Sequence, residues 1–360
     1  MKVKDAYEAI NAVAPFSTAL DWDNSGLQVG DMNAPLTGVL TALDVTMPVL
    51  EEAEKAGFNL IVSHHPVLFR AVKHFTAGDL AYEAARRGIS IISAHTNFDM
   101  AGGGVNAALA DALDLNDRVP LHCETRESWK KVSVFVPKSH AERLYSALSE
   151  IGCGAQGDYS GCAFLTSGEG RFKPETGAEP YLGEVGRETR VPEIRLEMIF
   201  PPRLQRRVID TIRRVHPYEE PAFDIFTTDG IASECWLGMV GYLPEPMDEE
   251  SFAELIARRL GVLPRYNPGH RMIQKVGVVG GAGGEYAALA LREGHQIDAF
   301  VTSEVKHHQF LEAESLGITL YDASHYGTEA VAVPCFTALL SEALDVPVRA
   351  ATAYDGRIAN

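Results

Sequence analysis

Cysteine is scarce in this chain and shows no ordered spacing. Only five of the 360 residues are cysteines, and no two of them form a CxxC motif. A disulfide framework or a zinc ribbon needs cysteines in paired or closely spaced positions, so the sequence argues against both. The five positions are scattered along the chain, at Cys123, Cys153, Cys162, Cys235 and Cys335.

The chain also lacks long apolar runs and an excess of basic residues. No run approaches the roughly 20 apolar residues of a membrane-spanning helix. The first residues form a mixed polar segment without the apolar core of a signal peptide. We therefore expect a cytoplasmic protein that does not enter a membrane. The formal net charge of −17 disfavours duplex nucleic acid as the main partner, because phosphate binding needs a basic surface.

The composition is that of an ordinary globular protein. Hydrophobic residues make up 46% of the chain and charged residues 22%, and its length suffices for two or three domains. Strands expected at 38–45, 58–63 and 89–93 alternate with expected helices at 47–55, 79–87 and 105–113. This α/β alternation predicts βαβ units and a parallel sheet, whose binding sites lie at the carboxyl ends of the strands.

The middle of the chain differs in charge and in pattern. Residues 127–230 hold 14 basic and 16 acidic residues, whereas the rest of the chain holds 18 and 33. The expected order of elements there is βαββαβ, with strands at 131–137, 162–166, 194–200 and 222–227 and helices at 140–151 and 204–215. This order is typical of the ferredoxin-like fold. We therefore expect residues 127–230 to form a domain inserted between an N-terminal lobe, 1–126, and a C-terminal lobe, 231–360.

The last part of the chain returns to the βαβ pattern. Strands are expected at 275–279, 297–302 and 318–322, and a helix at 307–315, so the two lobes are expected to be related halves of one domain. Residues 280–284, GGAGG, are interpreted as a tight turn between a strand and a helix. The amides of that turn could hold a phosphate, although the run lacks the third glycine of a dinucleotide-binding motif.

His64 and His65 form an unusual pair at the end of an expected buried strand, directly before Pro66. Successive side chains of a strand point to opposite faces, but at a strand end the backbone can turn and offer both rings to one cavity. Two diverging ligands suit two metal ions better than one. The alternative is a hydrogen-bonded buried histidine beside an exposed one.

Two further strand ends carry residues that bind metals. His95 and Asp99 follow the strand at 89–93, and His325 and Glu329 follow the strand at 318–322. In each pair the spacing of four places both side chains on one face if the segment is helical. We expect Thr328 to cap a helix that starts near Glu329. Mixed imidazole and carboxylate ligands suit zinc first, with iron, manganese, cobalt or nickel as alternatives.

Taken together, these motifs resemble those of the Nif-three-like family, whose members are commonly labelled GTP cyclohydrolase 1 type 2 homologues. The resemblance covers essentially the whole chain. The segment HPYEEPAFD resembles the long bacterial form, which carries an inserted domain similar to PII and CutA proteins; its prolines could equally mark a simple turn. The matching segments are 21–30 (DWDNSGLQVG), 63–69 (SHHPVLF), 95–99 (HTNFD), 216–224 (HPYEEPAFD) and 322–329 (DASHYGTE).

The resemblance implies a set of site residues and an assembly. Glu329 is expected to bridge two divalent metal ions, with Asp99 and His65 on one ion and His64 and His325 on the other. The catalytic residues are expected to be His95, which lines the same site, and Glu329. Family members form toroidal homohexamers. The chain has Ser303-Glu304 where the family usually has Gly-Asp, and Ser324 where it often has Gly, which puts any role of Glu304 in doubt.

The expected chemistry is metal-assisted hydrolysis of a small-molecule substrate, such as a nucleotide, by a hydroxide that bridges the two metals. The family label implies opening of the imidazole ring of GTP with loss of formate. A phosphoesterase would use the same kind of site. An alternative from another class is a metal-binding regulatory or sensor protein, in which the inserted domain controls access to the metal cavity.

Overall fold

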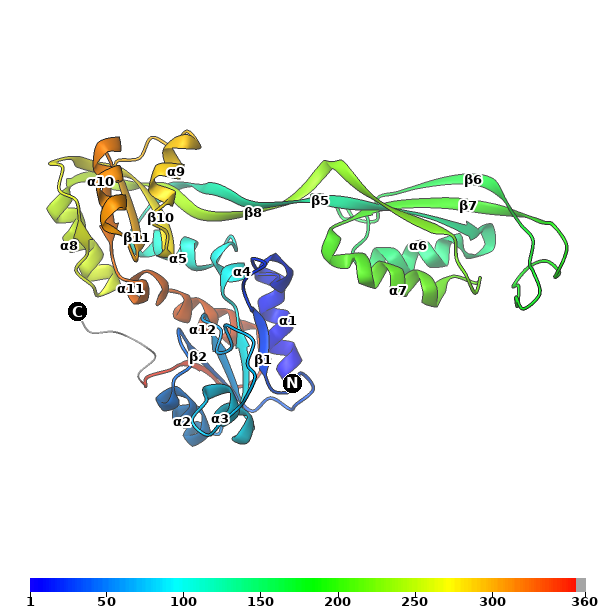
Figure 1. Ribbon diagram of the computed structural model, residues 1–360, viewed down its shortest axis with the longest axis horizontal. Coiled ribbons are helices and arrows are strands. Elements are labelled where there is room, and N and C mark those ends of the chain that lie inside the picture. The colour runs from blue at the N-terminus through cyan, green and yellow to red at the C-terminus, as the bar shows by residue number, and fades with distance from the viewer. Residues whose placement is uncertain (354–360) are drawn as a thin grey trace. The chain divides into compact units, whose positions relative to one another are not determined.

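The computed structural model describes residues 1–353, which divide into two compact units (Figure 1). Among these residues, the first unit consists of 1–124 and 235–353, and the second of Thr125–Glu234. The strands β5 (Asn116–Pro137) and β8 (Phe223–Asp248) each continue from one unit into the other. No helix among residues 1–353 is both long and apolar enough to cross a bilayer.

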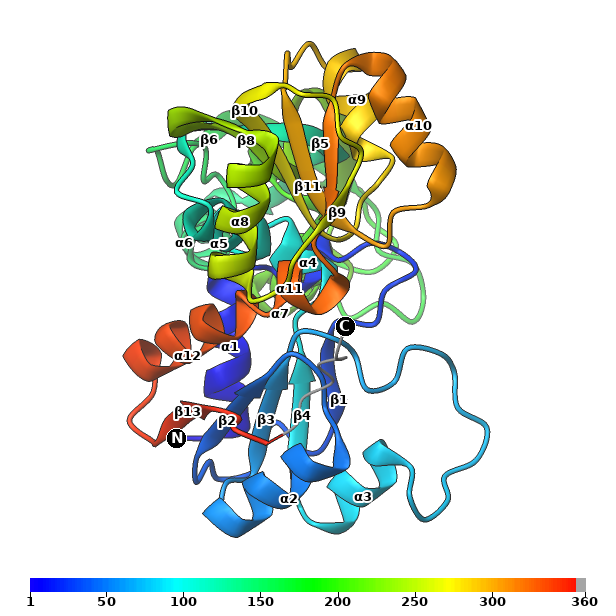
Figure 2. The ribbon, with the colours of Figure 1, turned by 90° about the vertical axis from the view of Figure 1, so that its left-hand side faces the viewer.

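A five-stranded sheet forms one half of the first unit, in the order β1-β4-β3-β2-β13. All neighbours are parallel except β1, which pairs antiparallel with β4. Figure 2 shows α2 and α3 beneath this sheet. The strands are β1 (Gly26–Val29), β2 (Val39–Ala42), β3 (Leu60–Ser63), β4 (Ser90–Ser93) and β13 (Val348–Ala350).

The alternation of strand side chains gives this sheet two buried faces. In β3, Leu60 and Val62 pack against helices α1 and α12, whereas Ile61 packs against α2 and α3. A strand buried on both faces is expected to be a continuous apolar run, which is what identified it in the sequence. The helices are α1 (Val3–Val13), α2 (Met47–Ala56), α3 (Leu80–Arg86) and α12 (Ala332–Ala343), with a short 3-10 turn, η1, at Phe16–Thr18.

The second sheet has eight strands, of which β8, β10, β11, β12 and β9 follow one another in this order. Strands β10, β11 and β12 are parallel, and β8 and β9 pair antiparallel at the two sides. Helices α5 and α8 pack on one face and α9 and α10 on the other. The further elements are α4 (Thr96–Asp99), α5 (Val105–Ala112), α8 (Glu249–Leu260), β9 (Arg265–Tyr266), β10 (Met272–Ala282), α9 (Tyr286–Arg292), β11 (Ala299–Ser303), α10 (His307–Leu316), β12 (Thr319–Asp322) and α11 (His325–Glu329).

The unit Thr125–Glu234 has its own core between one sheet face and two helices. Its strands follow the order β6-β7-β5-β8, and the valines of β5 pack against Leu144 of α6 and Ile212 of α7. The remaining elements are η2 (Lys138–His140), α6 (Ala141–Glu150), β6 (Ala163–Phe172), β7 (Thr189–Phe200), η3 (Pro202–Leu204) and α7 (Gln205–Val215).

The α/β fold class is confirmed, while several strand bounds differ from the expected ones. The sheets are mixed and not wholly parallel, because β1, β8 and β9 pair antiparallel with their neighbours. Strands β5 and β8 are also far longer than expected, since each serves both units. The expected turn at 280–284 is wrong in part, since β10 continues through two of the glycines to Ala282.

Candidate metal centre

Three strand ends of the first unit bring their polar side chains to one place. His64 and His65 follow β3 directly, His95 precedes α4, and α11 follows β12 after a two-residue turn. Three overlapping groups have potential ligand atoms within 4.8 Å of one another. The groups are His64, His65 and His95; His65, His325 and Glu329; and His64, Asp99 and Glu329. All six side chains named from the sequence therefore lie together.

Glu329 lies at the centre of the cluster and presents its two oxygens to different partners. Its Oε2 lies 2.7 Å from Nε2 of His65 and 2.8 Å from Nε2 of His325. Its Oε1 lies 3.8 Å from Nε2 of His64, which is itself 3.5 Å from Oδ1 of Asp99. The expected central place of Glu329 agrees with this geometry. By distance, His65 is grouped with His325 and His64 with Asp99, whereas the resemblance implies His65 with Asp99 and His64 with His325; which residues share an ion stays a prediction.

Each of the four histidines is held through its Nδ1 atom. The Nδ1 of His64 lies 2.9 Å from the backbone oxygen of Ala94, which can only accept a hydrogen bond, so this nitrogen donates. The other three Nδ1 atoms face carboxylates, at distances of 2.7 to 2.9 Å: His65 with Asp44, His95 with Asp23 and His325 with Glu304. A carboxylate or carbonyl on one ring nitrogen leaves the other nitrogen available to bind a metal or to transfer a proton.

These partner carboxylates were missed by the sequence reasoning. Asp44 follows β2, and Asp23 lies in the segment DWDNSGLQVG, but neither was assigned a role. Asp23 also accepts hydrogen bonds from the backbone and hydroxyl of Thr96 and from the hydroxyl of Ser25. The doubt about Glu304 came from a departure from the family pattern, yet Glu304 contacts His325 directly. Asp44 was overlooked because the expected strand at 38–45 included it, whereas β2 ends at Ala42.

The electrostatics of the cluster favour positive charge. Burial disfavours the charged form of His65, but hydrogen bonds to Asp44 and Glu329 outweigh burial and raise its pKa to about 10. The pKa values of His64 and His325 are raised as well, against the effect of burial, by the neighbouring carboxylates. Burial would raise the pKa of Glu329, but the surrounding histidines hold it well below its usual range. Asp99 has its pKa raised to about 6, chiefly by burial.

Two buried polar atoms of the cluster lack a hydrogen-bond partner. They are Nε2 of His64 and Oδ1 of Asp99. A buried polar atom without a partner costs free energy comparable to a lost hydrogen bond. An imidazole nitrogen and a carboxylate oxygen are both ligands of first-row divalent metals, so these atoms fit an ion between them. The donor set and its unpaired atoms therefore suit a metal centre.

The glycine run beside the cluster makes room for Glu329, and two of its amides are bonded within the protein. A Cβ on Gly281, whose φ is +69°, would lie 2.2 Å from Oε1 of Glu329. The amide of Gly281 donates to the hydroxyl of Thr328, and the amide of Gly280 donates to the side chain of Asn106. The suggested phosphate site is therefore wrong for these two amides, which already have partners within the protein.

The short helix α11 starts earlier than expected. Its cap is Ser324, whose hydroxyl accepts a hydrogen bond from the amide of Gly327, so the expected cap at Thr328 is wrong. Asp322 accepts from the amides of Ser324 and Val305 and thereby ties the turn before α11 to the segment that carries Glu304. This explains how Glu304 reaches His325.

Comparison with known proteins shows what the chain resembles. The family described as Duf34/NIF3 (NGG1p interacting factor 3) matches residues 1–354. A Bacillus subtilis protein named GTP cyclohydrolase 1 type 2 homolog is 39% identical over 319 residues, 87% of this chain and 85% of that protein. A Staphylococcus aureus protein of the same name is 33% identical and covers 98% of both chains. The crystal structure of a Bacillus cereus protein related to NIF3 is similar with a TM-score of 0.79 and 35% identity, covering 100% of this chain and 99% of that one.

Proposed function

Because this chain belongs to the Duf34/NIF3 family, we propose that its clustered histidines and carboxylates hold two divalent metal ions and hydrolyse a small-molecule substrate. The observation that carries the proposal is the position of Glu329. Its two oxygens face two different pairs of ligands, His65 with His325 and His64 with Asp99. A carboxylate placed in this way can bind one ion with each oxygen.

The residues suit two borderline ions of the first transition row. Imidazole and carboxylate ligands favour zinc, and iron, manganese, cobalt and nickel accept the same set. When bound, two such ions lower the pKa of a shared water toward neutrality and so supply a nucleophile for hydrolysis.

His95 is the side chain placed to move a proton. Hydrolysis takes up one water, whose proton must leave the attacking oxygen and reach the leaving group. The Nδ1 of His95 is 2.9 Å from Oδ1 of Asp23, which fixes the ring and leaves Nε2 for this transfer. Its ring lies 5.2 Å from that of His64 and 5.6 Å from that of His65. We propose His95 as the general acid and base of the reaction and Glu329 as the residue that links the two ions.

Two exposed aromatic rings beside His95 support a planar substrate. Trp22 is 59% exposed and Phe69 51% exposed, and the centroid of each ring lies 5.9 Å from that of His95. Exposed rings next to a reactive group offer a stacking surface for a heterocycle. This observation favours a nucleotide over a phosphoester that has no ring.

The test combines metal analysis with turnover. Purified protein should contain about two divalent ions per chain, and His65→Ala should lose metal and activity together, as expected when one ligand of a shared site is removed. His74→Ala is the matched control, because His74 is exposed and lies outside the cluster. Substrates should include GTP and a panel of phosphoesters with and without a ring. Metal-loaded protein that turns over none of them contradicts the hydrolase proposal and favours a regulatory protein.

A second variant tests the substrate class independently of metal binding. Trp22→Ala should raise KM for a nucleotide substrate about tenfold, as expected for loss of one stacking contact of 1–3 kcal/mol, and leave metal content unchanged. Trp236→Ala is the control, since Trp236 is also partly exposed but lies in β8 and not in the cluster. An unchanged KM would exclude stacking on Trp22.

A further inference from the structure

The unit Thr125–Glu234 contains a cavity of about 720 Å³ that belongs to no site described so far. It lies on the sheet face opposite α6 and α7. In β7, Ile194 and Leu196 point into the helical core, whereas the alternating residues Glu193 and Arg195 line the cavity. The volume is within the range of about 300–1,000 Å³ that is typical of small-molecule sites.

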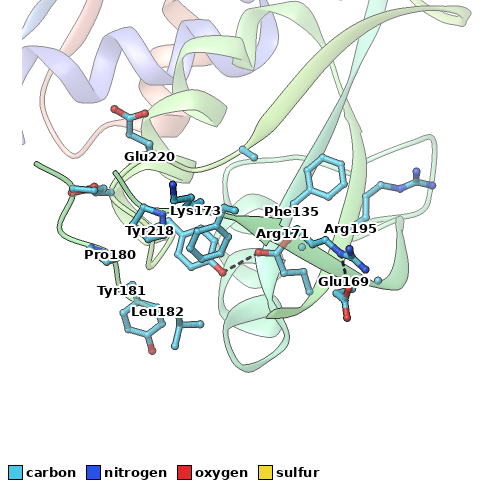
Figure 3. Close-up of a pocket in the computed structure, with 18 of the residues that line it drawn as sticks. Phe135, Glu169, Arg171, Lys173, Pro180, Tyr181, Leu182, Arg195, Tyr218 and Glu220 are labelled. Carbon is cyan, nitrogen blue, oxygen red and sulfur yellow. Dashed lines mark hydrogen bonds and ion pairs between the residues drawn. The ribbon is translucent and has the colours of Figure 1, made fainter. Parts of the chain in front are cut away.

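A long loop and a turn form the walls of the cavity above this face of the sheet. The loop between β6 and β7 contributes Pro174, Pro180, Tyr181 and Leu182, and the turn after α7 contributes Tyr218. Figure 3 shows Tyr181 and Leu182 at one end of the cavity, Arg171 and Arg195 toward the other, and Tyr218 between them. The walls are therefore aromatic and aliphatic at the loop end.

Glu193 is the buried carboxylate of this cavity. The residue is only 9% exposed, and its Oε1 accepts a hydrogen bond of 2.9 Å from the hydroxyl of Tyr218. Within residues 1–353, Glu193 forms no ion pair, whereas the cations that line the cavity are matched by other carboxylates. Arg171 pairs with Glu169 at 2.8 Å, Lys173 with Glu175 at 3.2 Å and Arg195 with Glu197 at 3.5 Å. The carboxylate of Glu193 therefore has a hydrogen bond from Tyr218 but no cationic partner among the described residues.

Tyr218, which contacts this carboxylate, lies close to two further aromatic rings. The ring of Tyr218 lies 5.6 Å from that of Phe172 and 6.4 Å from that of Tyr181, measured between centroids. Its hydroxyl donates to Glu193, and burial together with this hydrogen bond raises the pKa of Tyr218. The tyrosine thus stays protonated and holds the carboxylate in position. A carboxylate beside several aromatic faces is the arrangement that proteins use to bind organic cations.

We propose that this cavity binds a small organic cation, an ammonium group carried on an aromatic or aliphatic body. The ammonium group pairs with Glu193 and lies against the rings of Tyr218 and Phe172. The apolar part of the ligand fills the end of the cavity that the loop lines, beside Tyr181 and Leu182. An anion is disfavoured, because it would meet the unpaired carboxylate. The cavity is thus a ligand site separate from the metal cluster, with no part in the hydrolysis proposed above.

The experiment measures binding of matched probes to the full-length protein by calorimetry. Phenethylamine carries the cation, 2-phenylethanol is its neutral counterpart and phenylacetate its anionic counterpart. Phenethylamine should bind at least about tenfold more tightly than either of the others, because a buried hydrogen bond to a charged group contributes about 1.5–3 kcal/mol. Equal affinity for the three probes, or none for phenethylamine, would overturn the proposal.

Two glycines of β6 provide a matched pair of variants. A Cβ on Gly170 would lie 2.2 Å from Oε2 of Glu193, whereas a Cβ on Gly168 meets nothing within 4 Å, and neither glycine has a positive φ. Gly170→Ala should therefore weaken phenethylamine binding about tenfold, and Gly168→Ala should leave it unchanged. Glu193→Gln, which keeps the acceptor for Tyr218, should abolish the preference for the cation.

Two readouts keep the result interpretable. Metal content reports on the first unit and should be the same in all variants, and the fluorescence of Trp129 reports on folding of the second unit. If light scattering shows that Glu193→Gln changes the oligomeric state while no probe binds the native protein, the cavity is a contact between copies of the chain and the proposal is wrong.

Discussion

Gly281 shows how one missing side chain positions a functional group. The carboxylate of Glu329 occupies the place where a Cβ would be, 2.2 Å from Oε1. We predict that Gly281→Ala lowers metal affinity about ten- to a hundredfold, as is typical when the support of a ligand is displaced. Metal titration of the purified variant measures this.

The control for this prediction separates backbone strain from displacement of the ligand. Gly294 also has a positive φ, +86°, but a Cβ there would meet nothing within 4 Å. Gly294→Ala should therefore cost stability without a change in metal affinity. Equal metal binding by the two variants would show that Glu329 does not depend on the open space at Gly281.

Glu304 is the residue whose role the sequence left in doubt. It holds Nδ1 of His325 at 2.9 Å, although its own backbone has a φ of +53°. We predict that Glu304→Gln weakens metal binding about tenfold, because a carboxylate on the far nitrogen orients the imidazole and makes it more basic. Glu314→Gln, an exposed change in α10, should have no effect. A normal affinity in Glu304→Gln would mean that packing alone orients His325.

Ser324 combines a favourable cap with an unfavourable backbone conformation. Its φ of +60° and ψ of +154° lie in a region that is nearly restricted to glycine, which costs about 1–3 kcal/mol. Replacing a serine cap by glycine costs only a few tenths of a kcal/mol. Ser324→Gly should therefore raise the free energy of unfolding by about 1 kcal/mol, measurable by urea denaturation. A loss of stability would show that the hydrogen bond from Gly327 outweighs the strain.

At the scale of elements, one histidine ties a helix end to a strand. His216 follows α7; its Nε2 donates to the backbone oxygen of Phe135 in β5, and its Nδ1 accepts from the amide of Tyr218. Burial lowers the pKa of His216, despite the bond to Phe135, and nearby His140 adds to the shift. The unfolded chain then takes up the proton at a higher pH than the folded one. The contribution of His216 to the free energy of unfolding of this unit is therefore fully present above about pH 6.5 and is lost as the pH drops below that value.

Trp129 makes this pH dependence measurable. Its indole donates to the hydroxyl of Ser233 within the same unit, and Trp22 and Trp236 can be replaced by phenylalanine. When urea unfolding is followed by Trp129 fluorescence, the urea concentration at the midpoint should decrease as the pH is lowered from 7 to 5.5. His216→Gln removes the titrating group, so its midpoint should depend less on pH. An identical slope in both proteins would assign the effect to other groups.

The sequence pattern predicted which strands and helices exist, but it did not predict how long each of them is. The apolar run of β3 and the segment of α2, with Thr46 as its cap and Gly57 as its stop, correspond closely to the expected strand and helix. The full length of β5 and β8 could not be inferred from the sequence. Their outer parts are rich in polar residues and lack the alternation of apolar and polar side chains that identifies a strand. In these parts the strand conformation depends on pairing with neighbouring strands.

At the scale of the whole molecule, the metal cluster and the cavity lie in different units. Every residue of the cluster belongs to Met1–Glu124 or Cys235–Asn360. Strands β5 and β8 are neighbours in the sheet. We predict that replacing Thr125–Glu234 by an Asn-Gly turn gives a folded protein that keeps full metal content. Its affinity for phenethylamine should be lost. A variant that folds but loses metal would show that the second unit supports the cluster.

Self-association into a toroidal homohexamer stays a prediction. Light scattering of the native protein and of the shortened variant would establish the oligomeric state and show whether the second unit contributes to it.

The sequence by itself determined the α/β class, the alternation of strands and helices, and the strand ends at which histidines and carboxylates gather. These follow from local apolar periodicity and from the rule that sites lie at the carboxyl ends of strands. Tertiary structure alone decided which candidate ligands lie close together, that Asp44, Asp23 and Glu304 hold three of the histidines, and that Glu193 is buried without a cationic partner. The physical reason is distance along the chain: Glu329 lies 264 residues from His65, so only folding determines which oxygen faces which ring.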